Sequence, residues 1–385
     1  MPSGRTKLLI VFLITLVYRA SSNMLQTSVP LYAKYVLGQS DFTISIIVAL
    51  AQLATITSLL YLAYSEIGVG RSILVSLAFT SLTIPIFLVA QSAVALTLVN
   101  MFVNFWIGTL LPLLLTTVVL ISSPEVCDRN LTIFSAVLSL SLVLSPIYQG
   151  LLLTATNGNL AISMFLFAPL TGGATILFAL LMRSEKTLKT AREKFQLIFT
   201  QNPMYWIGIL AYESFNFPFI AILTFGGIFA RRNFGASYSM IEALFTAFFL
   251  TSLIVRLLLV RVSTLNDAVM LASFLVMAVA LPLVALSSNL WEFALSLVLF
   301  GYSHAAAYPV AWRYIARAVS NQALIAAYTV ASLIDASVYM IGTPLLGLAA
   351  QYYGLSGMFL IIEVPVFAIG IAYIGIMRFA VRQSG

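Results

Sequence analysis

Ionisable side chains stand inside long apolar runs of this sequence, where they could bind a solute or carry a proton. Arg19 and Glu213 have opposite charge, and each follows a tyrosine, Tyr18 or Tyr212. A charge at the centre of a bilayer costs about 2.5–3.5 kcal/mol on insertion scales, so each is a candidate site residue. The planar guanidinium of Arg19 suits a carboxylate or phosphate. Glu213 would carry a proton or pair with Arg19; the alternative is a static ion pair joining two half-bundles.

Further polar groups extend this candidate set. Asp335 is a second candidate proton carrier, since burial disfavours the charged form of a carboxyl; the alternative is a carboxyl hydrogen-bonded to neighbouring helices. His304, the single histidine, could be a proton site or a substrate donor, or a histidine that only packs between helices. Arg256 lies near the inner end of its run and is expected to snorkel, whereas Glu363 is expected to pack or snorkel. The amides predicted to bind substrate are Asn23, Gln26, Asn100, Asn104 and Asn216, together with the phenol of Tyr212.

The composition predicts a protein whose main solvent is lipid. The chain is 61% hydrophobic and 8% charged, with a mean hydropathy of +1.06, whereas a soluble domain carries about 25% charged residues. The formal net charge of +7 does not point to nucleic acid, because the basic residues gather in short loops between apolar runs. The single cysteine, Cys127, excludes an internal disulfide framework. The N-terminal apolar run is expected to be an uncleaved first helix rather than a signal peptide.

The apolar runs predict an all-α membrane protein with twelve transmembrane helices. Each run is continuous rather than alternating, which excludes barrel strands, and each can cross about 30 Å of hydrocarbon. The expected helices are residues 7–35, 42–64, 71–91, 94–121, 130–153, 159–183, 203–229, 239–260, 265–287, 290–316, 322–349 and 355–378. The polar stretch 184–202 divides the chain into residues 1–183 and 203–385. It is a cytoplasmic linker, either an amphipathic helix with Leu188, Ala191, Phe195 and Ile198 on one face or a plain solvated segment.

The two halves are related by a duplication. Prolines and glycines recur at a nearly constant spacing of about 197 residues, which chance does not readily produce. The matching pairs are Gly38 and Gly235, Pro85 and Pro282, Pro112 and Pro309, and Pro146 and Pro344. Two like-oriented six-helix bundles around a central cavity predict a ligand site near the bilayer midplane.

Two local motifs carry a family resemblance. Residues Arg129 to Gly150, ending in Ser145-Pro146-Ile147-Tyr148-Gln149-Gly150, are similar to an "R…GPxxGG" signature in which Ser145 and Gln149 replace glycines. The loop Tyr61–Arg71 keeps Glu66, Gly68 and Arg71 of a "GxLaDrxGRR" motif. The corresponding loop in the second half departs from it, with Val260 and Thr264 in place of a glycine and an acid.

With its six-plus-six repeat, the sequence resembles the major facilitator superfamily along its whole length. That resemblance implies that the first, fourth, seventh and tenth helices line the central cavity. These are the helices that hold Arg19, Asn100, Glu213 and His304. It also implies that small residues in the fifth and eleventh helices allow close packing where the two bundles meet.

Together these features predict a secondary transporter that moves a small organic, anionic solute by alternating access, with proton coupling. The alternatives are a proton-coupled multidrug exporter and, from another class, a non-transporting receptor or lipid-handling scaffold. The sequence has no phosphate-binding Gly-x4-Gly-Lys-Ser/Thr loop, metal-ligand cluster or nucleophile elbow, so no enzyme activity, cofactor or ATP use is expected. The expected partners are the solute, protons and the lipid bilayer, with no nucleic acid, and the protein is expected to be a monomer in the plasma membrane.

The distribution of basic residues predicts the orientation. The sequence has 19 Lys and Arg residues, of which Arg19 and Arg256 lie within helices. Three others, Lys34, Arg231 and Arg232, fall in loops on the side opposite the termini, and the remaining 14 lie on the side of the termini. By the positive-inside rule, both termini and residues 184–202 are cytoplasmic.

In a Cys127→Ser background on intact cells, an impermeant maleimide should therefore label Ser288→Cys and not Ser184→Cys. The reverse pattern would contradict this topology.

Overall fold

A computed structural model of the chain describes residues 4–64, 66–184, 188, 190, 192–193, 197, 200–262, 267–320 and 323–384. The chain divides into two compact units. Unit 1 comprises Met1–Gln39 and Leu50–Gln196, and unit 2 comprises Ser40–Ala49 and Leu197–Gly385. Each unit is described separately below.

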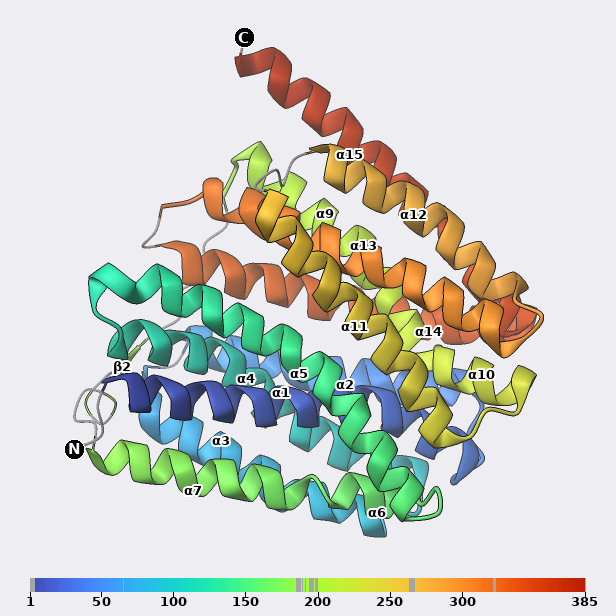
Figure 1. Cartoon of the computed structure of the whole chain (residues 1–385), viewed down its shortest axis with the longest axis horizontal. Coiled ribbons are helices and arrows are strands. Elements are labelled where there is room, and N and C mark those ends of the chain that lie inside the picture. Colours follow the sequence, from blue (N-terminus) through green and yellow to red (C-terminus); the bar gives the residue numbers. More distant parts are fainter. Residues whose placement is uncertain are drawn as a thin grey trace. The chain divides into compact units, whose positions relative to one another are not determined.

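Unit 1 is a bundle built around its first helix. In Figure 1, α1 lies alongside α5 and α7, and α3 packs against both α4 and α7. The helices are α1 (Gly4–Tyr35), α2 (Asp41–Tyr64, from Leu50 on), α3 (Val69–Thr83), α4 (Ala93–Ile121), α5 (Cys127–Ala155), α6 (Leu160–Phe165) and α7 (Ala168–Ser184). Short 3-10 turns, η1 (Ile84–Val89) and η2 (Pro124–Val126), join some of them. Strands β1 (Ile67–Gly68) and β2 (Arg192–Glu193) form one antiparallel pair.

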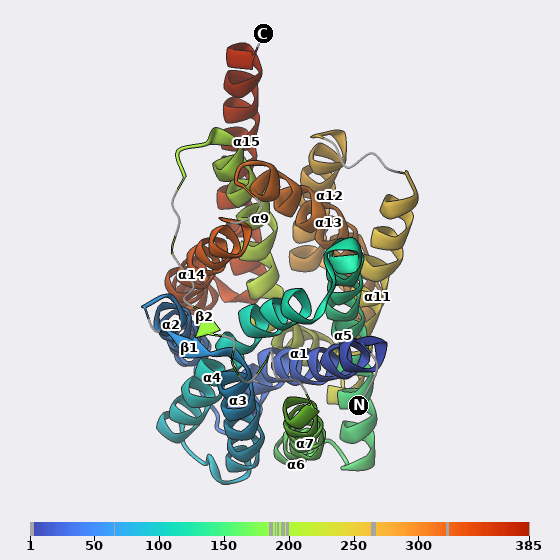
Figure 2. The same cartoon turned by 90° about the vertical axis from the view of Figure 1, so that its left-hand side faces the viewer.

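Unit 2 is a bundle in which α13 occupies the centre, packed against α9, α11 and α12. Figure 2 shows α11, α12 and α13 close to end-on as neighbours. Its elements are α9 (Pro203–Ala221), the π-helical turn η3 (Ile222–Gly226), α10 (Gly227–Phe234), α11 (Tyr238–Val262), α12 (Asp267–Leu286), α13 (Leu290–Arg317), α14 (Leu324–Ile361) and α15 (Glu363–Ser384). Residues 40–49 of α2 complete the unit.

The expected all-α membrane fold is confirmed. The described residues contain 11 helical segments long and apolar enough to cross a membrane. The last of these covers Ala326–Ile376 and has 51 residues, about 75 Å of helix, which is enough for two crossings. Gly354 breaks this segment inside α14 with φ 71°, a conformation that glycine adopts without strain. The segment therefore contains both the eleventh and the twelfth expected spans.

Some helix boundaries differ from the prediction, in two cases next to a proline, which interrupts the hydrogen-bond ladder. The helix expected over 71–91 changes to a 3-10 helix at Ile84, next to Pro85. The span expected over 159–183 is found as Leu160–Arg183, with a short turn between the end of α6 at Phe165 and the start of α7 at Ala168, just before Pro169. In unit 2, the helix expected to end at residue 229 continues through η3 to Phe234.

The duplication is visible in the backbone. Gly38 and Gly235, which match in the two sequence repeats, follow the first helical span of their respective halves with φ values of 65° and 66°. This left-handed conformation terminates a helix and favours glycine. The repeated glycines therefore mark the same turn in each half.

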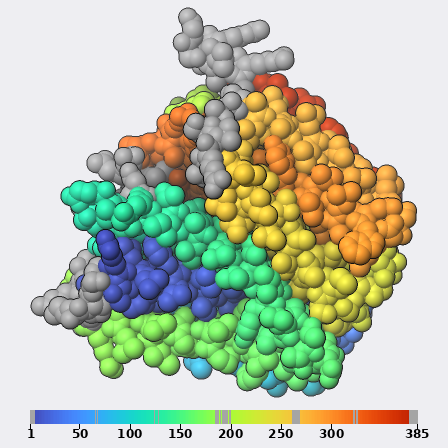
Figure 3. All heavy atoms as spheres, in the orientation of Figure 1, coloured from blue at the N-terminus to red at the C-terminus, as the bar shows by residue number. Residues whose placement is uncertain are grey.

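The surface of unit 2 suits a lipid environment. In Figure 3 the side chains of α11 and α12, yellow to orange, cover a broad face of the unit. The large apolar residues on these helices are exposed, with Leu257, Leu275 and Val279 between 55% and 71% accessible. Monomeric soluble proteins rarely expose contiguous apolar surface on this scale, so the face is expected to contact acyl chains.

Few residues of the expected linker are described, and its role as a cytoplasmic linker stays a prediction. Leu188 is helical and fully buried, and the backbone at Arg192–Glu193 pairs with β1. A Cβ added at Gly70 would lie 2.6 Å from the carbonyl oxygen of Leu188, so this segment passes directly over the start of α3. The remaining residues of the proposed amphipathic face, Ala191, Phe195 and Ile198, lie outside the described residues.

Candidate functional site

The polar centre of unit 2 begins on α9. Glu213 is 6% exposed, and neither of its carboxylate oxygens has a hydrogen-bond partner in the described part of the chain. One turn further along, Asn216 Nδ2 donates a hydrogen bond to Asp335 Oδ1 at 3.0 Å. The two carboxyl groups lie close enough to interact electrostatically. The structure thus brings Glu213, Asn216 and Asp335 together from α9 and α14, as a shared site requires.

Aromatic rings form one wall of this centre. The ring of Tyr212 lies 5.7 Å from that of Tyr308 and 5.3 Å from that of Trp312. Trp312 in turn meets Tyr328 edge-on at 4.4 Å. The indole Nε1 of Trp312 is buried without a hydrogen-bond partner among the described residues. Tyr212 also bonds to Asn216 and interacts electrostatically with Glu213 and Asp335, so the wall adjoins the acids.

His304 is bonded through both ring nitrogens. Its Nδ1 lies 2.7 Å from Ser252 Oγ, and its Nε2 lies 3.4 Å from an Arg256 amino group, which also donates to the His304 carbonyl at 3.3 Å. Because a guanidinium can only donate, Nε2 is assigned as the acceptor and Nδ1 as the protonated nitrogen of a neutral imidazole. The ring packs against Phe215 and Phe219 at 4.7 and 5.2 Å.

The prediction that Arg256 snorkels is therefore wrong. Its guanidinium carbon lies 4.9 Å from the centre of the Tyr308 ring, and its hydrogen bonds go to α13. The depth of a residue along a helix does not reveal which face it occupies, and Arg256 faces α13 rather than the helix end. A signal for this contact is Ser252, four residues before Arg256 in the sequence, because residues four apart lie on the same helix face.

Of the two outcomes expected for Glu363, packing or snorkelling, the structure shows packing. At 8% exposure its side chain is buried rather than extended toward water, and neither carboxylate oxygen has a hydrogen-bond partner in the described residues. It stands at the first residue of α15. Snorkelling is excluded for this side chain.

Unit 1 has its own polar centre on α1 and α4. Asn23 is 1% exposed, and both atoms of its amide are without hydrogen-bond partners in the described residues. Arg19, partly exposed, precedes it by one turn, and Gln26 is also partly exposed. On α4, Asn104 Nδ2 donates to the carbonyl oxygen and to Oδ1 of Asn100, at 2.8 and 2.9 Å. Arg19 and Glu213 belong to different units, and their pairing stays a prediction.

Helix α5 holds α1 at the positions where the resembled motif has glycines. Ser145 Oγ donates to the Ala20 carbonyl at 2.7 Å. Gln149 Nε2 donates to Ser28 Oγ at 2.9 Å and to Ser163 Oγ at 3.0 Å. The two departures from the motif thus replace close glycine packing by hydrogen bonds that fix α1 on either side of Asn23.

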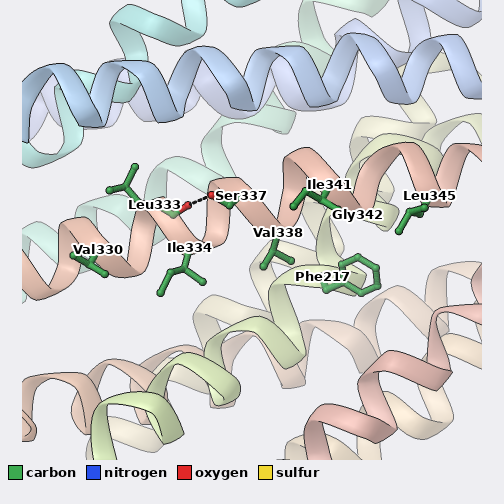
Figure 4. Close-up of a pocket in the computed structure, with 9 residues that line it drawn as sticks. All are labelled: Phe217, Val330, Leu333, Ile334, Ser337, Val338, Ile341, Gly342 and Leu345. Carbon is green, nitrogen blue, oxygen red and sulfur yellow. Dashed lines mark hydrogen bonds between the residues drawn. The ribbon is translucent and has the colours of Figure 1, made fainter. Parts of the chain in front are cut away.

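A separate apolar cavity of about 530 Å³ lies along α14. Figure 4 shows Phe217 of α9 facing a row of α14 side chains, with Ser337 bonded to the carbonyl of Leu333 in its own helix. The other lining residues are Val330, Ile334, Val338, Ile341, Gly342 and Leu345. None of the predicted site residues is among these described lining residues, and none of the nine is charged.

Comparisons with known proteins agree on one fold. A family model described as Major Facilitator Superfamily matches the chain twice, at residues 11–231 and 214–384. A mutant of peptide transporter POT is 14% identical over 96% of this chain and 94% of its own, with a TM-score of 0.79. A bacterial homolog to human lysosomal transporter Spinster, inward-facing and occupied, is 14% identical over 98% of both chains, with a TM-score of 0.75.

Nucleoside transporter NupG is 12% identical over 96% of this chain and 99% of its own, with a TM-score of 0.72. At these identities the likeness establishes the fold alone. No curated protein matches the sequence significantly.

The bonds of Arg256 lead to a stability prediction. Arg256→Gln removes a charged donor from His304 and should lower the free energy of unfolding by about 1.5–3 kcal/mol. Arg317→Gln, at an exposed position near the end of α13, is the matched control and should stay within about 0.5 kcal/mol of the parent protein. Denaturation of purified protein in detergent measures both. Equal effects would mean that the Arg256 contacts add nothing to stability.

Proposed function

The chain belongs to the major facilitator superfamily, and we propose that it is a secondary active transporter that moves a small organic solute with an anionic group, coupled to protons. The single observation that carries this proposal is the carboxyl of Glu213, buried in a membrane-spanning helix without a hydrogen-bond partner among the described residues. An ionised carboxylate in such a place is costly unless it is paired. A carboxyl that takes up a proton avoids this cost while it is neutral, so a proton carrier can occupy such a place.

The anionic character of the solute rests on Arg19 and Asn23. Arg19 is a cation within the span Arg5–Tyr35, and its guanidinium presents a fork of donors that fits a carboxylate or phosphate. Asn23, one turn away, has buried amide atoms without partners in the described residues and can bond to a polar solute. Gln26, Asn100 and Asn104 are proposed to complete the contacts made by unit 1.

In unit 2, Tyr212 and Asn216 are proposed to contact the solute, with Glu213 as the main proton carrier and Asp335 as its partner. His304 is proposed to bind the solute after the solute displaces Arg256 or Ser252. Both ring nitrogens of His304 are in contact with these two residues in the structure.

The cellular setting is also part of the proposal. The two six-helix bundles, 1–183 and 203–385, would alternate in exposing the site to either side, joined by the cytoplasmic linker 184–202. Both termini would be cytoplasmic in a plasma-membrane protein that acts as a monomer.

A thermal-shift screen of purified protein against classes of metabolites tests this function directly. A ligand that binds only the folded state stabilises it by RT ln(1 + [L]/Kd), about 2.7 kcal/mol at a concentration 100-fold above Kd. Small organic anions should raise Tm, and esters or amides of the same compounds should not. A screen in which only neutral or cationic lipophilic compounds raise Tm would favour the multidrug exporter instead.

Arg19 gives the first mutational prediction. Arg19→Lys keeps the charge but loses the two-pronged hydrogen bond, so the affinity for an anionic hit should fall about tenfold. Arg19→Ala should weaken binding about 30-fold or more while the protein still folds. Titration calorimetry measures both. Arg5→Ala, at an exposed position of the same helix, is the control and should bind normally. Unchanged affinity in folded Arg19→Ala protein would remove Arg19 from the site.

Glu213 gives the second. Glu213→Gln imitates the protonated carboxyl, so it should preserve solute binding and solute exchange in proteoliposomes. Accumulation driven by a pH gradient should be lost, because no proton can leave the amide. Glu363→Gln is a matched control, since Glu363 is a carboxyl of similar burial on another helix, also without a hydrogen-bond partner in the described residues. If Glu213→Gln still accumulates solute, Asp335 is the next candidate.

A further inference from the structure

The apolar cavity of about 530 Å³ along α14 lies beside the polar centre of unit 2. We call it the α14 cavity. Asn216, which bonds to Asp335, is followed directly by Phe217, which lines the cavity. On α14, Asp335 directly follows Ile334 and precedes Ser337 by two residues, and both of these neighbours line the cavity. The polar centre and the cavity are thus built by the same stretches of α9 and α14.

The walls of the α14 cavity are apolar. Ser337 is the one polar side chain among the nine described lining residues, and its hydroxyl donates to the Leu333 carbonyl of its own helix at 2.7 Å (Figure 4). A ligand therefore gains from this surface by burying apolar area rather than by hydrogen bonding. The cavity volume falls within the range of about 300–1,000 Å³ that is typical of pockets for small organic ligands.

Phe217 forms the wall of the cavity on the α9 side, since the other described lining residues all belong to α14. Its ring lies directly against a glycine. A Cβ added at Gly342 would collide with Cε2 of the Phe217 ring and would lie 3.1 Å from Cδ2. Glycine at position 342 thus allows the ring to pack this close to α14, and the position of the ring sets the width of the cavity.

The depth of the cavity favours a solute over a bilayer lipid as its occupant. Asp335 follows Ala326, the first residue of its apolar segment, by nine residues, about 14 Å of helix. At this depth a lipid presents only its acyl chain, which has no group that bonds to Asn216 or Asp335. A solute held at Asn216 instead places the rest of its body beside the cavity.

We propose that the α14 cavity receives an apolar group of the transported solute, so that the solute is an amphiphilic organic anion rather than a wholly polar one. This inference rests on the proposed function, which places the solute at Tyr212 and Asn216. Burial of hydrocarbon in the cavity supplies affinity, and Phe217 limits the size of the group that fits. The anionic group binds outside the cavity, since none of the nine described lining residues is charged.

Titration calorimetry of the protein in nanodiscs with straight-chain carboxylates tests this inference. The acids from propionate to decanoate share one carboxylate and differ only in the length of their hydrocarbon. Heats measured with empty nanodiscs are subtracted, because the longer acids also partition into lipid. The affinity should rise about two- to fourfold with each added methylene until the cavity is filled.

Variants of the two walls test where the hydrocarbon lies. Val338→Phe narrows the cavity and should weaken the binding of octanoate about tenfold while leaving that of propionate within about twofold. Phe217→Ala removes the α9 wall and should shift the tightest binding to a longer acid. The matched controls on α15 are Val364→Phe and Phe367→Ala, at positions that are 69% and 53% exposed, and both should bind like the parent protein. Size-exclusion chromatography establishes that each variant is folded.

The inference is overturned if the affinity does not depend on chain length, which is also the result expected if a bilayer acyl chain already fills the cavity. It is equally overturned if Val338→Phe and Val364→Phe bind octanoate alike, or if no acid in the series binds.

Amides of the same chain lengths separate these outcomes from failure of the proposed function. Amides that bind as tightly as the acids, with the same dependence on chain length, would leave the assignment of the cavity standing and contradict the anionic character of the solute. Acids that bind equally well at every length, with amides that do not bind, would leave the anionic solute standing and exclude the cavity.

Discussion

The constraint on which this structure depends is that hydrocarbon supplies no hydrogen-bond partners. Hydroxyl groups in the spans accordingly bond to the preceding turn of their own helix, as Thr15 does to Val11 and Thr117 to Leu113. Some amides bond across helices, as Gln149 does to Ser28, and others within one helix, as Asn104 does to Asn100. Against this background, a buried polar group without a partner in the described residues is informative. Asn23 in unit 1 and Glu213 in unit 2 are such groups, and both lie on the first span of their half.

The same constraint explains why helix interruptions occur where they do. Pro85, Pro112 and Pro146 each remove a backbone donor, and the surrounding helix responds by tightening into a 3-10 turn at Pro85 while continuing as an α-helix at the other two. Gly38 and Gly235 instead end helices in a left-handed turn. The two glycine turns are therefore the same in both halves. The repeated prolines differ, because Pro282 lies inside the α-helix α12 whereas Pro85 lies in the 3-10 helix η1.

Much of the fold could be predicted from the sequence, because a span needs only sufficient apolar length, and length is directly readable. The candidate acids were also predictable, since charge in an apolar run is rare. The bonds of Arg256 were not, because they depend on which face of α11 meets α13. The membership of residues 40–49 of α2 in unit 2 was not predictable either.

The two acids of unit 2 differ in a way that separates their roles. Asn216, three residues after Glu213 on α9, donates a hydrogen bond to Asp335. Asp335 is thus fixed in position by a donor that stabilises its charged form, whereas Glu213 has no such donor among the described residues. Within the proposed transport cycle, a carboxyl without such a donor changes its charge with the smaller loss of hydrogen bonding, so we assign the exchanged proton to Glu213 rather than to Asp335.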